Sequence, residues 1–131
     1  MGRQITTGVL HYVVPKDAIV KKVKDIDYSE YLVSLRRGGG SEVLLLFRGT
    51  NDSPFPGQAD VEGSLEYKQR GLRLPNGVDG IDARGILLVE GVRKQWRTAG
   101  VKAEFAEYRN ASADGATYFD AIINSACYQD H

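Results

Sequence analysis

The sequence contains few of the residues that build covalent or metal-stabilised folds. Cys127 is the only cysteine among 131 residues, and there are two histidines. One cysteine cannot form an intrachain disulfide, nor can it supply a cysteine cluster for zinc or an iron–sulfur centre. The longest uninterrupted apolar run, Val43 to Phe47, is much shorter than a bilayer requires, so we predict no transmembrane segment in the printed sequence.

An excess of charge of either sign is also missing, because 17 basic residues are balanced by 17 acidic ones. This balance argues against nucleic acid as a partner. The charges are nevertheless unevenly distributed: residues 49–67 carry four acidic and no basic residues, whereas residues 68–109 carry nine basic and five acidic residues. These segments could steer a charged partner or neutralise each other within the fold, and we favour neutralisation.

Length and composition predict one domain over residues 1–131, since 42% of the residues are apolar and a chain of this size can bury one core. The segment Met1 to Gln4 lacks the apolar run of a secretory signal. We expect a cytoplasmic protein, or the processed part of an exported precursor. A single cysteine is compatible with either compartment.

Alternating apolar residues predict strands through most of the chain. The expected strands cover residues 5–14, 28–35, 43–47, 86–89, 92–99 and 101–105, with a bulge at Gly71 in the segment around residues 65–74 and a turn at Gly100. Residues 16–27 are ambiguous between an irregular edge and a short turn of helix. Because residues 43–47 are apolar on both faces, we expect them to form a central strand.

The end of the chain changes to a helical period, with apolar residues at 116, 119, 122, 123, 126 and 127. Asn110 or Ser112 would start this helix. The fold class predicted is α+β, a single-layer antiparallel meander sheet of about six to seven strands covered by a C-terminal helix. We expect Cys127 and Trp96 to be buried under that helix, and Arg97, with its neighbours Arg93 and Gln95, to face solvent.

Recognisable catalytic motifs are missing. There is no Gly-x-Ser-x-Gly, and the run Gly38 to Ser41 lacks the lysine and the following helix of a phosphate-binding loop. Asp79 and Asp82 do not follow a calcium-loop pattern. Cys127 and His131 stand four residues apart, so on a continuing helix a thiol and an imidazole could meet as a nucleophile–base pair. We therefore predict a non-enzyme with no cofactor and no metal site, and we keep an enzyme using Cys127 and His131 as a minor alternative.

The segment from Gly49 to Gly63 contains two of the four prolines and several turn-forming residues, which indicates a long loop that is either functional or merely mobile. We predict a binding surface there, built on Phe55, with Arg48 at the entrance of the loop and Arg84 as a further member. The partner would be a protein or a small molecule, and the sequence does not indicate an oligomeric state.

Three segments resemble the PsbP-like family of small α+β domains. They are Tyr12 to Pro15, Leu44 to Gly49 and Phe119 to Ser125. The resemblance implies an antiparallel sheet closed by a C-terminal helix, and it implies a binding or assembly module with no catalytic residue to carry over.

A second hypothesis is a carrier of a small apolar ligand. The curved sheet and the C-terminal helix would enclose a cavity between them, lined by Tyr31, Phe47, Trp96 and Phe105.

Overall fold

The structure is a computed structural model that describes residues 2–35, 42–50 and 54–130. Its elements are β1 (Gly2–Thr6), β2 (His11–Pro15), β3 (Ile19–Lys24), β4 (Tyr28–Ser34), β5 (Val43–Gly49), α1 (Gln58–Gly63), β6 (Glu66–Arg73), β7 (Asp79–Val89), β8 (Val92–Val101), β9 (Glu104–Ala111), α2 (Ala113–Asn124) and β10 (Gln129–Asp130). All strand pairs are antiparallel, so the expected α+β class is confirmed.

The main sheet has eight strands in the order β10-β6-β7-β8-β9-β5-β4-β3, and β1 and β2 form a separate hairpin. The prediction of a single meander is therefore wrong. Two meanders, β3-β4-β5 and β6-β7-β8-β9, meet where β5 pairs with β9. This pairing puts β5, the most apolar strand, at an interior position in the sheet.

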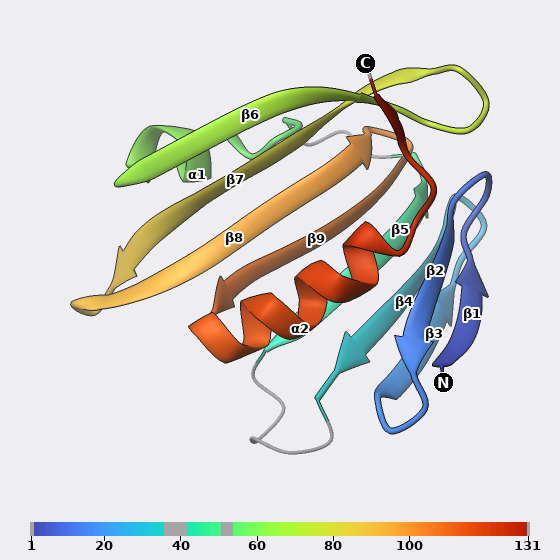
Figure 1. The fold of residues 1–131 in the computed structure, drawn as a ribbon, viewed down its shortest axis with the longest axis horizontal. Helices are drawn as coiled ribbons and strands as arrows, with labels where there is room; N and C mark the ends of the chain where they lie inside the picture. Colours follow the sequence, from blue (N-terminus) through green and yellow to red (C-terminus); the bar gives the residue numbers. More distant parts are fainter. Residues whose placement is uncertain (1, 36–41, 51–53, 131) are drawn as a thin grey trace.

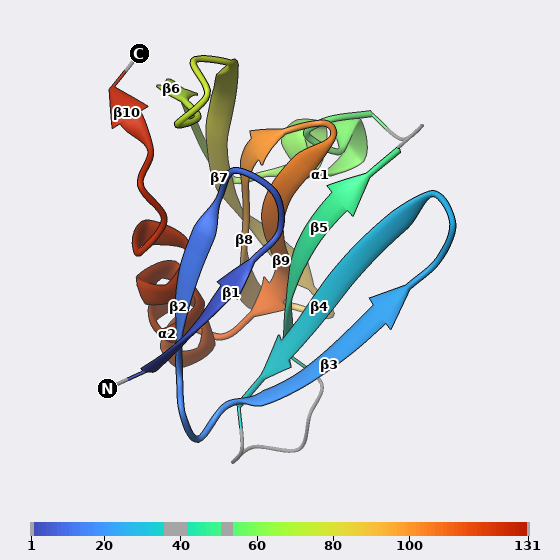
Figure 2. The ribbon, with the colours of Figure 1, turned by 90° about the vertical axis from the view of Figure 1, so that its right-hand side faces the viewer.

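The sheet is covered differently on its two faces (Figures 1 and 2). Helix α2 and the β1–β2 hairpin lie against one face, and α1 lies against the other. We call these the α2 face and the α1 face. Successive side chains of a strand point to opposite faces, so each strand contributes to both.

Several local predictions were wrong. Residues 5–14 do not form one strand, because the chain turns between Thr6 and His11. The ambiguous segment 16–27 contains β3 at one edge of the main sheet, so of its two alternatives the edge agrees with the structure and the turn of helix does not. Strand β6 pairs with β7 without a register shift at Gly71. Gly100 lies within β8, and the turn follows Val101.

An irregularity occurs instead between β8 and β9, where Gln95 pairs with Ala111 but Arg97 pairs with Tyr108. The extra residue on β9 accompanies Asn110, whose φ of 54° lies in the left-handed region that asparagine tolerates. As a result, Tyr108 and Ala111 both contribute to the core on the α2 face.

The main core lies between the α2 face, the helix and the hairpin. It includes Leu10, Tyr12 and Val14 from the hairpin, Leu44 and Leu46 from β5, and Phe119, Ile122 and Ile123 from α2. The apolar stripe of the helix is thus confirmed, except at Cys127. That residue is exposed, because α2 ends at Asn124 and the chain has left the helix before it reaches the cysteine.

Ser112 is the N-cap of α2, which confirms one of the two predicted starts of the helix. Its Oγ accepts a hydrogen bond from the Gly115 amide at 3.1 Å. The Glu42 carboxylate accepts hydrogen bonds from the Ser112 amide and hydroxyl at 2.6 and 2.9 Å. A carboxylate at this end complements the helix dipole, so the segment before β5 stabilises a helix 70 residues later in the chain.

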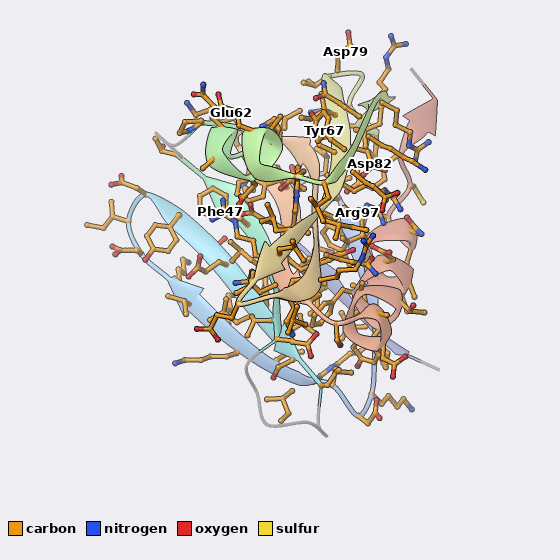
Figure 3. All side chains as sticks on the ribbon, turned by 90° about the vertical axis from the view of Figure 1, so that its left-hand side faces the viewer. Phe47, Glu62, Tyr67, Asp79, Asp82 and Arg97 are labelled. Carbon is orange, nitrogen blue, oxygen red and sulfur yellow. The ribbon has the colours of Figure 1, made fainter. Side chains whose placement is uncertain are left out.

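A buried guanidinium joins the sheet to α2. Arg97 donates to both carboxylate oxygens of Asp82 at 2.9 Å, to Asp120 at 3.1 Å and to Asn124 at 2.9 Å. The side chains of Arg97 and Asp82 are each 1% exposed. Figure 3 shows both on the side of the sheet that carries α2. The prediction that Arg97 faces solvent was wrong. The alternation of β8 places its side chain on the face covered by α2, where carboxylates neutralise its charge.

The hairpin is attached through another buried carboxylate. Glu104 at the start of β9 accepts hydrogen bonds from the Thr7 hydroxyl at 2.6 Å and from the amides of Val9 and Leu10 at 3.2 and 3.0 Å. Such bonds satisfy a carboxylate that would otherwise be costly to bury. They also fix the β1–β2 turn against the sheet.

Replacing Arg97 with methionine should lower the free energy of unfolding by about 3–5 kcal/mol, because Asp82 would remain buried without its main partner. Urea denaturation followed by Trp96 fluorescence measures this. The matched control is Arg93→Met on the same strand, which breaks an ion pair with Glu66 that is exposed on both sides and should cost less than about 1 kcal/mol. Equal losses in the two variants would contradict the role given to Arg97.

The pKa of Asp82 should lie below its ordinary value. Burial alone would raise this pKa, but the hydrogen bonds and charge of Arg97, with Arg84 and Arg70, outweigh burial and lower it. The carboxylate therefore stabilises the fold at pH values above the unfolded aspartate pKa of about 3.9, and this contribution is lost as the pH falls through the lower folded value. A carboxyl carbon NMR titration should place the midpoint of Asp82 below 3.9; a midpoint above it would contradict the ion-pair description.

Candidate functional site

Four aromatic rings form a row on the α1 face. Tyr28 of β4 stacks on Phe47 of β5 with ring centroids 6.0 Å apart, and Phe47 stacks on Phe105 of β9 at 5.0 Å. Phe55, which precedes α1, packs against Phe105 at 5.2 Å. The row exists because β4, β5 and β9 are neighbours and Phe47 is registered with Phe105.

These rings line a groove of about 540 Å³, within the size range of ligand sites. We call it the aromatic groove. Its lining residues are Tyr28, Glu30, Leu45, Phe47, Thr50, Pro54, Phe55, Gly57, Phe105, Glu107 and Arg109. Phe47 and Phe105 are buried and form a fixed floor, whereas Tyr28 and Phe55 are partly exposed. The groove thus combines a rigid base with accessible rings.

The groove also carries charge. Arg109 pairs with Asp60 of α1 at 2.9 Å and with Glu107 at 3.2 Å, so this cation is compensated. Glu30, directly across from Phe47 in the β4–β5 pairing, makes no hydrogen bond or ion pair with any residue in the described part of the chain. One carboxylate therefore remains available beside the aromatic rings.

Trp96 is buried, as predicted, but on the α1 face instead of under α2. Its Nε1–H donates to Ser64 Oγ at 2.8 Å, and its ring stacks on Tyr67 at 5.9 Å. Gly85 makes this approach possible, since a Cβ there would lie 2.6 Å from both the Ser64 hydroxyl and the Trp96 nitrogen. Trp96 therefore fixes the end of α1 and does not line the aromatic groove.

The three residues predicted from the sequence as a binding surface are not brought together. Phe55 lines the aromatic groove. Arg48 is exposed on the other face, beside Gly8 of the hairpin turn, because it shares its strand parity with Leu46. Arg84 also lies on the α2 face, next to Asp82. The segment 49–63 is only partly a loop, since it contains α1; residues 51–53 lie outside the described residues.

The other two sequence hypotheses find less support. Tyr31 packs against the main core on the α2 face, whereas Phe47, Trp96 and Phe105 lie on the α1 face, so the four do not line one cavity between sheet and helix. Cys127 is exposed, and His131 lies outside the described residues. Within the described ranges, no group of three or more histidine, cysteine, aspartate or glutamate side chains is placed to hold a metal ion.

Sequence reasoning missed Tyr28 and Glu30. Both follow the alternation of β4, which predicts that they share a face with each other and not with Tyr31. What the sequence could not supply is the pairing of β4 and β5 with β9, because that contact joins segments separated by α1 and three strands.

Comparisons of the chain with protein-family models, with curated proteins and with solved structures found no match. None of the helices in the described part of the chain is long and apolar enough to cross a membrane. The site must therefore be interpreted from its own geometry and charge.

Replacing Ser64 with alanine should lower the free energy of unfolding by about 1–2 kcal/mol, because the buried Trp96 N–H would lose its acceptor. Ser64 Oγ also donates to the Asp60 carbonyl at 2.6 Å, so the end of α1 would loosen as well. Denaturation followed by the fluorescence of the sole tryptophan measures the change. In the control, Ser29→Ala, the serine hydroxyl makes no hydrogen bond within the described residues, and stability should stay within about 0.5 kcal/mol of the wild type. If Ser64→Ala left the free energy of unfolding unchanged, the hydrogen bond from Trp96 Nε1 to Ser64 would contribute nothing to stability.

Proposed function

We propose that this chain is a non-catalytic binding domain that takes a segment of a partner polypeptide in the aromatic groove. The segment would present an apolar or aromatic side chain next to a lysine or arginine. The observation that carries this proposal is the Glu30 carboxylate, which has no partner among the described residues, beside a row of four aromatic rings.

Aromatic rings give large contact areas with little loss of side-chain freedom. Phe47 and Phe105 are already held by their mutual stacking, so binding would not have to order them. Tyr28 and Phe55 at the two ends of the row are exposed enough to touch a ligand. These properties support the groove as the place where an apolar side chain docks.

Charge supports a basic neighbour for that side chain. Helix α1 begins directly after Gly57 of the groove, and it carries Asp60 and Glu62 and no basic residue. Among the described residues that line the groove, Arg109 is the only cation, and it is already shared by Asp60 and Glu107. A cation on the partner would pair with Glu30 and lie over the rings, an arrangement favourable for lysine and arginine.

The resemblance to PsbP-like domains stays a prediction and agrees with a non-enzymatic role. An antiparallel sheet with a C-terminal helix is the arrangement that it implies. The compartment likewise stays a prediction.

Selection of random 12-residue displayed peptides against the wild-type protein tests the proposal. Enriched peptides should carry an apolar or aromatic residue within two positions of a lysine or arginine. Their affinity should fall at least about tenfold for Phe55→Ala, which removes a ring of the groove, and about threefold for Glu30→Gln, which removes only the charge.

The matched control is Leu88→Ala, which removes another exposed apolar side chain from a strand outside the groove. Its affinity should equal that of the wild type, and Trp96 fluorescence should report an intact fold in all three variants. Failure to enrich any peptide, or enriched peptides that bind Phe55→Ala as well as wild type, would overturn the proposal.

A further inference from the structure

A second hollow lies on the α2 face, beyond the helix. Helix α2 contacts β8 and β9, and β6 and β7 extend past it (Figure 1). There, Lys68, Gln69, Arg70, Asp82 and Arg84 line a space of about 390 Å³. We call it the basic pocket. It is independent of the aromatic groove, because it lies on the opposite face of the sheet.

Strand register explains why the cations gather. Lys68 of β6 pairs with Arg84 of β7, and Arg70 pairs with Asp82, so all four side chains share one face. Like charges on Lys68 and Arg84 directly opposite each other are unfavourable in a sheet. Asp82 offsets part of this cost at Arg84, and an additional anion beside Lys68 and Arg84 would offset more of it.

Asp82 does not neutralise the pocket. Its carboxylate is already engaged by Arg97, and the same Oδ2 also accepts from Arg70 Nε at 3.2 Å and from Arg84 Nη2 at 3.4 Å. Asp120 is the other carboxylate in contact with Arg97. Four cations, Lys68, Arg70, Arg84 and Arg97, therefore face two carboxylates, Asp82 and Asp120, which leaves a surplus of two positive charges.

The donors of the pocket are held in place and still available. Asp82 orients Arg70 through its Nε and Arg84 through one Nη atom, which leaves the other N–H groups of each guanidinium free of ion pairs with the described residues. The side chains of Arg70 and Arg84 are 64% and 43% exposed. Lys68 makes no ion pair or hydrogen bond within the described ranges.

We propose that the basic pocket binds a phosphate monoester. Two guanidinium groups anchored by one buried carboxylate suit an anion with several oxygens, and arginine matches phosphate geometry with paired hydrogen bonds. The surplus of two positive charges corresponds to the charge of a monoester dianion. The phosphate could belong to a small metabolite or to a phosphorylated protein segment, and the pocket would recognise the same group in both.

Calorimetric titration at low ionic strength with glycerol 3-phosphate and with a phosphoserine hexapeptide tests this proposal and separates the two sources. At least one of the two probes should bind, and acetate should bind more weakly than that probe. Lys68→Gln should weaken binding about threefold and Arg84→Gln about tenfold. Neither substitution removes Arg97 from Asp82, so the fold should persist, as checked by Trp96 fluorescence.

Two variants serve as matched controls, each removing the same charge from the opposite face. They are Lys94→Gln on β8 and Arg73→Gln on β6. Binding should be unchanged in both. If neither probe bound at millimolar concentration, the proposal would be overturned. So would equal weakening by Lys68→Gln and Lys94→Gln, because that result would mean that only the overall charge matters.

Discussion

The contact between Arg97 and Asp82 is the interaction on which the rest of the molecule depends. A charged side chain buried at the centre of a sheet must be neutralised, and here one guanidinium is shared by a strand carboxylate, Asp82, and by two residues of the helix, Asp120 and Asn124. Tyr108 adds a hydrogen bond to Asp120 at 2.9 Å. Burial, followed by the charge and hydrogen bond of Asp120, raises the pKa of this tyrosine. Apolar packing would tolerate small rotations of the helix, but these directional bonds do not, so they fix its angle across β8 and β9.

With α2 held in this position, the two faces of the sheet differ in how much of their surface is buried. The α2 face between the helix and the hairpin is filled by the main core. In the part of the chain that the structure describes, the helix that covers the α1 face has six residues, and Phe47 and Phe105 form the floor of an open groove beside it. Figure 3 shows Phe47 and Tyr67 on this side and Asp82 and Arg97 on the other. The α2 face therefore holds most of the buried core, and the aromatic rings of the α1 face stay partly accessible.

Local patterns in the sequence predicted the parts of the fold that depend on neighbours in the chain. The Ser112 cap, the apolar stripe of α2 and the alternation of β4 follow from short-range geometry, and the structure contains all three. Arg97 could not be assigned in this way, because a buried arginine looks like a surface residue until its partners are known. The aromatic groove depends on β5 pairing with β9. The orientation of the Ala111 side chain towards the core depends on the irregularity at Asn110. Long-range contacts of this kind leave no periodic signal in the sequence.

The junction of the two meanders also has a consequence during protein synthesis. Strands β3, β4 and β5 can pair as soon as they leave the ribosome, but β5 has no neighbour on its second edge until β9 is made. Gly49 ends β5 and Glu104 begins β9. At roughly 5–20 residues per second, the delay is about 3–11 s. During that time the most apolar strand of the protein presents an unpaired edge, which is the condition under which a nascent chain most needs chaperone protection.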